Sequence, residues 1–343
     1  MPVNSVSIII PCRNEAQAIG PVLDSILAQD FHGADWEIII VDGMSEDGTR
    51  SILDRYRQLE PRIRVMDNTS KVVPVGLNQA IRAARGDIVL RMDAHTSYAP
   101  DYVRRCLETL DAACADNVGG PARTCANGYW GRAIAAAYHS ALACGGAKFH
   151  DPGYEGWVDT VPYGCWRKST LLQIGLFDER FIRNQDDELN LRILRSGGRI
   201  YQSPAIVSWY RPRSSLQKLF LQYFQYGFWK VPVIRKHRMP ASWRHLAPPL
   251  FVSANVLMPA AGLAIPHLWA LWAAGIILYF LLCFLASAVC ARKNGWRLLP
   301  ALPLVFLAYH LAYGAGFLSG LCYWSFAKGE SEAPKSVFTQ VSR

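Results

Sequence analysis

The 343-residue sequence predicts an open α/β domain with a mainly parallel central sheet, followed by apolar helices that cross a membrane. Two observations support the α/β domain. Short β-branched segments alternate with helix-like segments over the first 95 residues, and polar clusters follow the ends of these segments. A third observation supports the membrane part, because residues 246–326 are rich in Leu, Ala, Phe, Trp and Val and nearly free of charge. The chain therefore divides near residue 240.

The strand and helix signals come in a regular order. Strands are expected at residues 6–10, 37–41, 62–66 and 87–92, with helices between them at residues 21–29, 47–59 and 75–84. Open α/β sheets bind ligands at the carboxyl ends of their strands, where the polar clusters fall. The following part is less regular, with helices expected at residues 101–115 and 188–195 and a small-residue stretch at 131–146.

Three apolar segments follow, at residues 246–265, 268–291 and 298–326, and each reaches the roughly 20 residues that cross a bilayer. Tryptophans near their ends indicate membrane interfaces. The first segment contains three prolines, so a re-entrant or interfacial helix is the alternative there. Residues 214–231 are aromatic and apolar with scattered Gln and Lys, which is typical of an amphipathic helix at a membrane surface.

Charge is unevenly distributed along the chain, whose formal net charge is +9. Residues 1–188 carry 25 acidic and 19 basic side chains, whereas 15 Lys or Arg and no acid lie between Glu188 and Glu330. Basic residues that flank apolar segments usually follow the positive-inside rule and contact anionic lipid. We therefore expect membrane lipid, and no nucleic acid, as the partner of this basic region.

Cysteine usage and the N-terminus indicate a reducing compartment. The nine cysteines are odd in number, form no C-x-x-C pair and are spread through apolar segments. The first apolar run has no basic region before it and stops at Pro11, so it predicts a strand and no signal peptide. We expect the front domain to face the cytosol.

Two polar clusters end the first two strands. The first consists of Pro11, Arg13, Asn14 and Glu15, and the second is the segment V-D-G-M-S-E-D-G-T, which begins with Val41 and Asp42. Neither is a GxGxxG or Walker loop, which argues against a dehydrogenase or a P-loop kinase. A carboxylate at a strand end, such as Asp42, is able to accept hydrogen bonds from a base imide or a ribose hydroxyl. Asp47 is expected mainly to cap the next helix.

Together these motifs resemble the family 2 glycosyltransferases, whose catalytic domain has the GT-A fold. The resemblance covers residues 5–230 and rests on P-x-x-N-E, V-D-G-x-S-x-D-G-T and the segment A-R-G-D before R-M-D-A-H, in that order. Among its members, the chain is most similar to the glucosyltransferases of succinoglycan synthesis. The implied organisation is a GT-A domain at 1–210, a basic interface segment at 211–245, about three transmembrane helices at 246–327 and a polar tail at 328–343.

The family's D-x-D motif binds a divalent cation, and the resemblance places Asp93 on its first carboxylate. His95 stands where the second carboxylate usually is. Two ligands at i and i+2 are able to face one ion, with the donor diphosphate and water completing an octahedron. Imidazole shifts the preference from magnesium toward manganese, so Mn²⁺ or Mg²⁺ is expected. The alternative is that Asp93 caps a helix and His95 has no role.

The segment at 184–192 is similar to the family's E-D-x-D-L-x-x-R motif, whose central Asp is the general base. Counting back from Arg192 places Asp186 on that base, with adjacent Asp187 as the second candidate. Adjacent acids repel one another and raise a pKa, which suits a group that takes a proton from a sugar hydroxyl. As an alternative, these acids have only a structural role, because acidic side chains are favoured in the first turn of a helix.

Further donor-site candidates are Lys71, Arg91, Trp166, Arg211 and Arg213. Trp166 is expected to stack on a sugar face. The two later arginines pair either with the leaving diphosphate or with lipid head groups. Residues 222–230 lie where processive members carry Q-x-x-R-W, and the lack of that motif argues against a polymerase.

The resemblance implies an inverting transfer of a hexose from UDP-hexose, with UDP-glucose as the expected donor, to a polyprenyl-diphosphate-linked oligosaccharide. The expected place is the bacterial inner membrane, as a multi-pass protein with a cytoplasmic catalytic domain and polysaccharide-assembly proteins as further partners. A polyprenyl-phosphate sugar synthase and a processive polysaccharide synthase are the alternatives among enzymes. A membrane scaffold with a degenerate GT-A domain is the alternative outside them.

Overall fold

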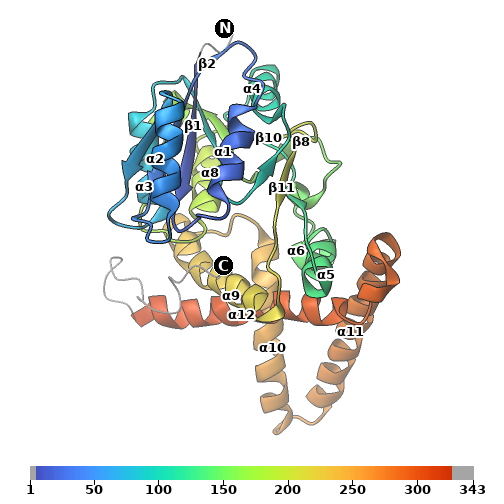
Figure 1. Ribbon diagram of the computed structural model, residues 1–343. Helices are drawn as coiled ribbons and strands as arrows, with labels where there is room; N and C mark the ends of the chain where they lie inside the picture. Colours follow the sequence, from blue (N-terminus) through green and yellow to red (C-terminus); the bar gives the residue numbers. More distant parts are fainter. Residues whose placement is uncertain (1–4, 327–343) are drawn as a thin grey trace. The chain divides into compact units, whose positions relative to one another are not determined.

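The computed structural model describes residues 5–326, which form two compact units (Figure 1). The first unit comprises the chain up to residue 123 and residues 151–211. The second comprises residues 124–150 and the chain from residue 212 onward. The chain therefore enters the second unit twice.

The first unit is built on an eight-stranded sheet with the strand order β3-β2-β1-β4-β9-β6-β10-β8. Its strands are β1 (Ser5–Cys12), β2 (Asp35–Asp42), β3 (Ile63–Asp67), β4 (Ile88–Arg91), β6 (Asn117–Gly119), β8 (Gly156–Val158), β9 (Cys165–Arg167) and β10 (Ile200–Gln202). The strands β1 to β4 pair in parallel, whereas β9 is antiparallel to both β4 and β6. The carboxyl ends of β1, β2 and β4 therefore meet at one edge of the sheet.

Successive side chains of the central strands point alternately into two apolar layers, one on each face of the sheet. In β1, Val6, Ile8 and Ile10 belong to one buried cluster and Ile9 to another. The helices of the first layer are α1 (Ile19–Leu27), α2 (Thr49–Leu59) and α4 (Tyr102–Ala112), and those of the second are α3 (Val73–Ala83), α7 (Lys168–Gln173) and α8 (Gln185–Arg195). Since side chains alternate across a strand, helices cover both faces of the sheet (Figure 1).

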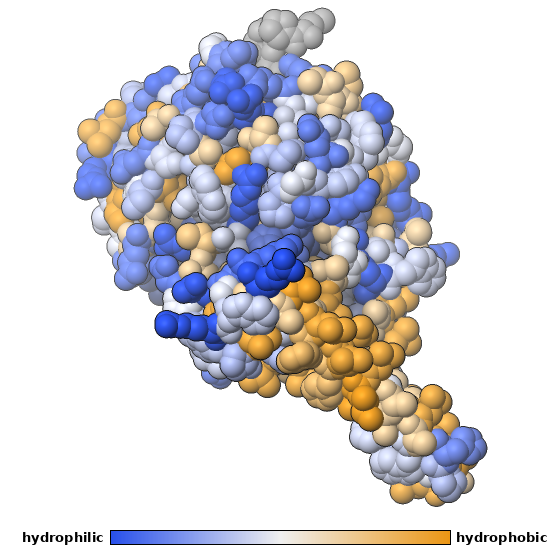
Figure 2. All heavy atoms as spheres, turned by 90° about the vertical axis from the view of Figure 1, so that its right-hand side faces the viewer, coloured by the Kyte–Doolittle hydropathy of each residue, from blue (hydrophilic) through white to orange (hydrophobic). Residues whose placement is uncertain are grey.

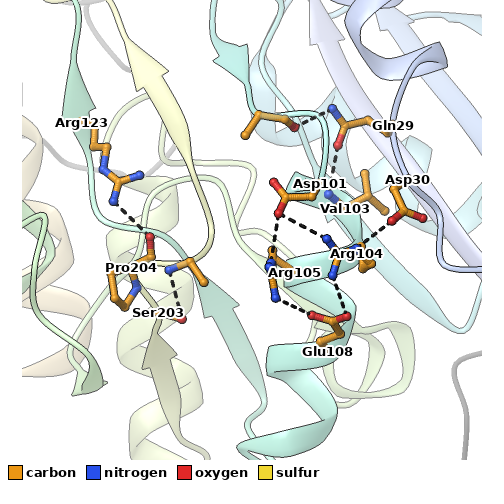
Figure 3. A network of polar contacts seen from close by, with 12 residues as sticks. Gln29, Asp30, Asp101, Val103, Arg104, Arg105, Glu108, Arg123, Ser203 and Pro204 are labelled. Atoms are coloured by element: carbon orange, nitrogen blue, oxygen red, sulfur yellow. Dashed lines mark hydrogen bonds and ion pairs between the residues drawn. The ribbon is translucent and has the colours of Figure 1, made fainter.

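Polar contacts connect α4 to the end of α1 (Figure 3). The Gln29 side chain donates to the Ala99 carbonyl at 2.8 Å and accepts from the Val103 amide at 3.1 Å. Arg104 forms ion pairs with Asp30 at 2.7 Å, with Asp101 at the start of its own helix and with Glu108 within it. A separate three-stranded sheet contains β5 (Ser97–Tyr98), β11 (Ser208–Tyr210) and β7 (Arg123–Thr124). These contacts position the loop that follows β4.

The second unit is helical. Its elements are α5 (Tyr129–Tyr138), α6 (Ala141–Cys144), η1 (Lys148–His150), α9 (Leu216–His237), η2 (Trp243–Leu246), α10 (Ala247–Gly262), α11 (His267–Asn294), η3 (Trp296–Leu298) and α12 (Leu302–Phe326). Helices α9 and α12 approach so closely that a Cβ atom on Gly316 would lie 2.0 Å from the Phe224 carbonyl oxygen. A Cβ on Gly227 would lie 2.1 Å from the Tyr313 carbonyl oxygen. Glycines at such positions let two helix backbones touch.

Two helices of this unit, α11 and α12, are long and apolar enough to cross a membrane, by length and composition. The first of the three expected spans is instead the 16-residue α10, which contains Pro259 and falls short of the roughly 20 residues required. Apolar side chains of α10 and α11 are exposed, and Figure 2 shows a hydrophobic surface in orange.

The structure also differs from the expected continuous domain at 1–210, because residues 124–150 belong to the second unit. The reason is their apolar content: Ala133, Ile134 and Ala137 of α5 are buried with Val305 and Phe306 of α12. The expected interface segment at 211–245 contains the whole of α9, which ends at His237. The expected tail at 328–343 lies outside the described residues.

Candidate active site

Arg91 links two carboxylates that lie far apart in the sequence. It ends the buried strand β4 and is only 6 % exposed. Its Nε donates to Oδ1 of Asp93 at 2.9 Å, and one terminal nitrogen donates to Oδ2 of the same residue at 3.2 Å. The other terminal nitrogen donates to Oδ1 of Asp186. Burial alone would lower the pKa of Arg91, but the carboxylates of Asp186 and Asp93 raise it above its usual value.

Asp186 lies in the first turn of α8, next to Asp187 and Glu188. Acids are favoured there because the helix dipole is positive at its N-terminus. About 40 % of the Asp186 side chain is exposed, yet loss of surrounding water still raises its pKa. Arg91 opposes this effect, whereas Asp93 and Asp187 add to it. A carboxylate with a raised pKa is suited to accept a proton.

Two tyrosines hold the loop between Asp93 and β5: Tyr98 is buried and Tyr163 is partly buried. The Tyr98 hydroxyl accepts a hydrogen bond from the backbone amide of Asp93 at 2.6 Å. The Tyr163 hydroxyl lies 2.8 Å from Oγ1 of Thr96, and its ring contacts Tyr98 edge-on. Burial raises the pKa of both tyrosines. Sequence reasoning missed them; the one available signal was that Tyr163 directly precedes the Gly164-Cys165-Trp166 segment.

The ends of β1 and β2 form one interlocked loop pair. The amide of Asn14 donates to Oγ of Ser45 at 2.8 Å, and Oδ1 of Asn14 accepts from the amide of Glu46 at 2.9 Å. Arg13 packs against Gly43, where a Cβ atom would lie 3.1 Å from the arginine Cδ. His95, which follows the end of β4, contacts this loop pair, since its Nδ1 lies 3.5 Å from Oε1 of Glu15.

Comparison of the sequence with known proteins identifies the family of the chain. The model of glycosyl transferase family 2 matches residues 7–154. The succinoglycan biosynthesis protein ExoA of Rhizobium meliloti is 30 % identical over 312 residues, which cover 90 % of this chain and 93 % of the relative. The chain belongs to glycosyltransferase family 2. The predicted family and the predicted enzyme class are thereby confirmed.

Two further comparisons extend over nearly the whole glycosyltransferase. A dolichyl N-acetyl-alpha-D-glucosaminyl phosphate 3-beta-D-2,3-diacetamido-2,3-dideoxy-beta-D-glucuronosyltransferase of Methanococcus voltae is 28 % identical and covers 93 % of the chain and 97 % of the relative. The solved mannosyltransferase PcManGT from Pyrobaculum calidifontis, in complex with GDP-Man and Mn²⁺, superposes with a TM-score of 0.61 at 22 % identity. It covers 90 % of this chain and 86 % of that one. This likeness confirms the predicted GT-A fold.

Two predicted ligand residues of the glycosyltransferase are fully buried. Asp42 is 0 % exposed, and its carboxylate accepts hydrogen bonds from the amide and hydroxyl of Ser45 and lies 3.3 Å from a guanidinium nitrogen of Arg50. Trp166 is 2 % exposed and packs edge-on against Phe177 in the second apolar cluster. Trp166 therefore has no exposed ring face in this structure, and its expected stacking on a sugar stays a prediction.

The other candidates lie in separate places. Pro11 lies within β1, opposite Val41, and Lys71 extends toward Glu46, with 3.7 Å between Nζ and Oε1. Asp187 shares the first turn of α8 with Asp186. Arg211 is the last residue of the first unit, whereas Arg213 belongs to the second. Asp47 accepts from the amides of Ala16 and Thr49, as a structural cap does.

Asp93 and His95 are the side chains that the sequence predicts for a divalent cation, and both carboxylate oxygens of Asp93 accept hydrogen bonds from Arg91. Within residues 5–326, no three His, Cys, Asp or Glu side chains converge on one point. One carboxylate and one imidazole nevertheless fit a cation that takes most of its ligands from substrate phosphates and water, as Mg²⁺ commonly does. The donor set therefore fits a cation that arrives with the diphosphate.

Proposed function

We propose that the glycosyltransferase moves a hexose, glucose from UDP-glucose, onto a polyprenyl-diphosphate-linked oligosaccharide during the synthesis of an exopolysaccharide or another surface polysaccharide. The relatives support this class of acceptor by their names: one is a succinoglycan biosynthesis protein and the other acts on a dolichyl-linked sugar phosphate. The two long apolar helices support a location at the membrane, and we propose the cytoplasmic face of the bacterial inner membrane.

The contact of Arg91 with both Asp93 and Asp186 carries the proposal. It brings the expected phosphate-side residue and the expected base to opposite sides of one guanidinium. Asp186 takes the proton of the acceptor hydroxyl while that oxygen attacks the anomeric carbon. The bond from this carbon to the diphosphate oxygen breaks, the nucleoside diphosphate leaves, and the configuration inverts. Asp187 is the alternative base.

Asp93 and His95 would hold Mn²⁺ or Mg²⁺, which neutralises charge on the leaving diphosphate when bound. For the nucleotide, the proposed surroundings are the interlocked loop pair with Pro11, Arg13, Asn14 and Glu15, together with Lys71, which extends toward Glu46 of that pair. Asp42 holds these loops through its hydrogen bond with Ser45. Its carboxylate would bind the nucleotide base only after giving up this hydrogen bond. Arg211 and Arg213 are proposed for the diphosphate or for lipid phosphate.

A polyprenyl-phosphate sugar synthase is the second candidate, although the dolichyl-linked relative is named for transfer onto an acceptor that already carries a sugar. The two functions differ in product. One added hexose on an oligosaccharide lipid supports the first, a monosaccharide lipid supports the second, and a ladder of products would indicate a processive enzyme.

The decisive experiment is mass spectrometry of lipid-linked products from membranes with and without the protein. The same membranes should be supplied with UDP-glucose, UDP-galactose or GDP-mannose, each with manganese, with magnesium or with excess chelator. We expect one added hexose from UDP-glucose and no product in chelator. Full activity in chelator would contradict the metal role, and transfer from another donor would correct the sugar.

A further inference from the structure

The second unit has a charge composition that the proposed reaction does not use. Its described residues, 124–150 and 212–326, contain 12 Lys or Arg and no Asp or Glu. Basic groups without acidic neighbours in the same unit repel one another and favour an external anion. The same unit exposes apolar side chains of α11, among them Phe284, Leu285 and Val289. A bilayer supplies both an anionic surface and an apolar interior.

A cavity of about 330 Å³ lies where the C-terminal end of α11 meets α5 and η3. Its walls include Gly128, Tyr129, Arg132, Asn294, Arg297 and Leu298. Arg132 comes from α5 and Arg297 from η3, so two elements far apart in the sequence each contribute one guanidinium. Neither arginine forms an ion pair with any residue between 5 and 326.

The walls of this cavity suit a phosphate group that is attached to an apolar chain. Guanidinium groups bind phosphate through paired, charge-assisted hydrogen bonds. Tyr129 is 44 % exposed, and Trp296, next to Arg297, is 61 % exposed. Exposed aromatic side chains at the end of an apolar helix are typical of the level of lipid head groups. Buried Leu298 adds an apolar wall.

We propose that this cavity binds the phosphate of an anionic phospholipid, whose acyl chains lie along the exposed apolar side chains of α11. A cation pair at this place fixes the end of α11 at the head groups. The site is one built pocket, distinct from a general attraction between the basic second unit and an anionic surface.

The chain offers a matched control for this distinction. Arg292 and Lys293 lie in the last turn of α11, directly before Asn294, and neither lines the cavity. The double variant R292Q/K293Q therefore removes as much charge as R132Q/R297Q from the same end of the helix. The variant R132K/R297K keeps the charge and removes the paired geometry of the guanidinium groups.

The test is native mass spectrometry of the full chain in detergent, titrated with dioleoylphosphatidylglycerol, dioleoylphosphatidylcholine or inorganic phosphate. We expect one tightly bound phosphatidylglycerol per chain. R132Q/R297Q should weaken it by about tenfold or more, R132K/R297K by less, and R292Q/K293Q by less than about threefold. Thermal unfolding and donor hydrolysis of all variants should stay unchanged, which separates this site from the proposed transfer reaction.

Equal weakening by the two charge-removing double variants would overturn the proposal, because a diffuse basic surface predicts that result. Binding of inorganic phosphate as tightly as phosphatidylglycerol would also overturn it, since the cavity would then be a site for free phosphate. Equal affinity for phosphatidylcholine would remove the role of net lipid charge and overturn it as well.

Discussion

Arg91 carries a positive charge in the interior of the first unit, and two carboxylates from different elements surround it. A buried cation is costly unless it is paired, so Asp93 and Asp186 stabilise Arg91 as much as Arg91 positions them. Because the two carboxylates share this one cation, a change at Arg91 alters the ionisation of Asp186. This linkage gives two predictions at the scale of residues.

The variant Asp186→Asn should abolish transfer and leave nucleotide-sugar binding nearly intact, because a base is required only for acceptor attack. We expect kcat to fall by roughly a hundredfold or more, while donor affinity measured by calorimetry stays within a few fold. Asp187→Asn is the matched control in the same helical turn. A dead Asp187→Asn enzyme beside an active Asp186→Asn enzyme would show that the base is Asp187.

The pH dependence should change when Arg91 is replaced by Gln. The raised pKa of Asp186 places the acidic limb of kcat above the usual range of an aspartate, since the base acts only when ionised. Arg91 favours the ionised form and lowers this pKa, so Arg91→Gln should move the limb to higher pH. Transfer rates between about pH 5 and pH 8 would measure it. Arg82→Gln, at an exposed arginine, is the control; an unmoved limb would assign the titration to another group.

Sequence motifs predicted Asp93, His95 and Asp186 because their spacing within short segments resembles a known pattern. The bridge through Arg91 was beyond sequence reasoning, since it joins residues 95 positions apart and depends on the fold. The surroundings of Trp166 also depend on the fold. Its motif predicted a sugar platform, but packing against Phe177 decides its environment.

At the scale of elements, the contact of α9 with α12 depends on small residues. Gly227, Gly316 and Gly320 each face a backbone carbonyl of the opposite helix at a distance that leaves no room for a Cβ atom. The apolar content of both segments was visible in the sequence. Their mutual register was not, because a Gly in an apolar segment is also tolerated without a packing role.

Gly316→Ala should therefore destabilise the protein by about 1–3 kcal/mol, because the added methyl group forces the two helices apart. Gly275→Ala is the matched control, since nothing lies within 4 Å of a Cβ atom at Gly275 of α11. That change should be neutral or stabilise the helix by up to about 1 kcal/mol. Thermal unfolding in detergent measures both, and equal midpoints would show that the helices do not need this close approach.

Across the whole molecule, the β-branched periodicity and the apolar segments predicted an α/β domain and a membrane part. The discontinuous second unit escaped prediction, because residues 124–150 contain short apolar stretches that are also typical of a soluble domain. What distinguishes them is their partner, since α5 is buried with residues of α12.

A fragment that ends at residue 245 should retain the first unit, since all of its residues and both Asp93 and Asp186 are present. It should also expose the faces of α5 and α9 that α12 covers in the full chain. In detergent, we expect the fragment to bind the donor almost normally, as measured by calorimetry. In detergent-free buffer, we expect the fragment to precipitate, as followed by size-exclusion chromatography. A monodisperse fragment in detergent-free buffer would contradict the prediction.

The return of the chain to the second unit also has a consequence for biosynthesis. Translation proceeds from the N-terminus, so α5 leaves the ribosome long before α12 exists. Until then Ala133, Ile134 and Ala137 have no final partner from the C-terminal helix. The apolar side chains of α5 therefore wait for their partner until the last helix of the chain has been made, whereas every strand of the eight-stranded sheet is synthesised before that helix.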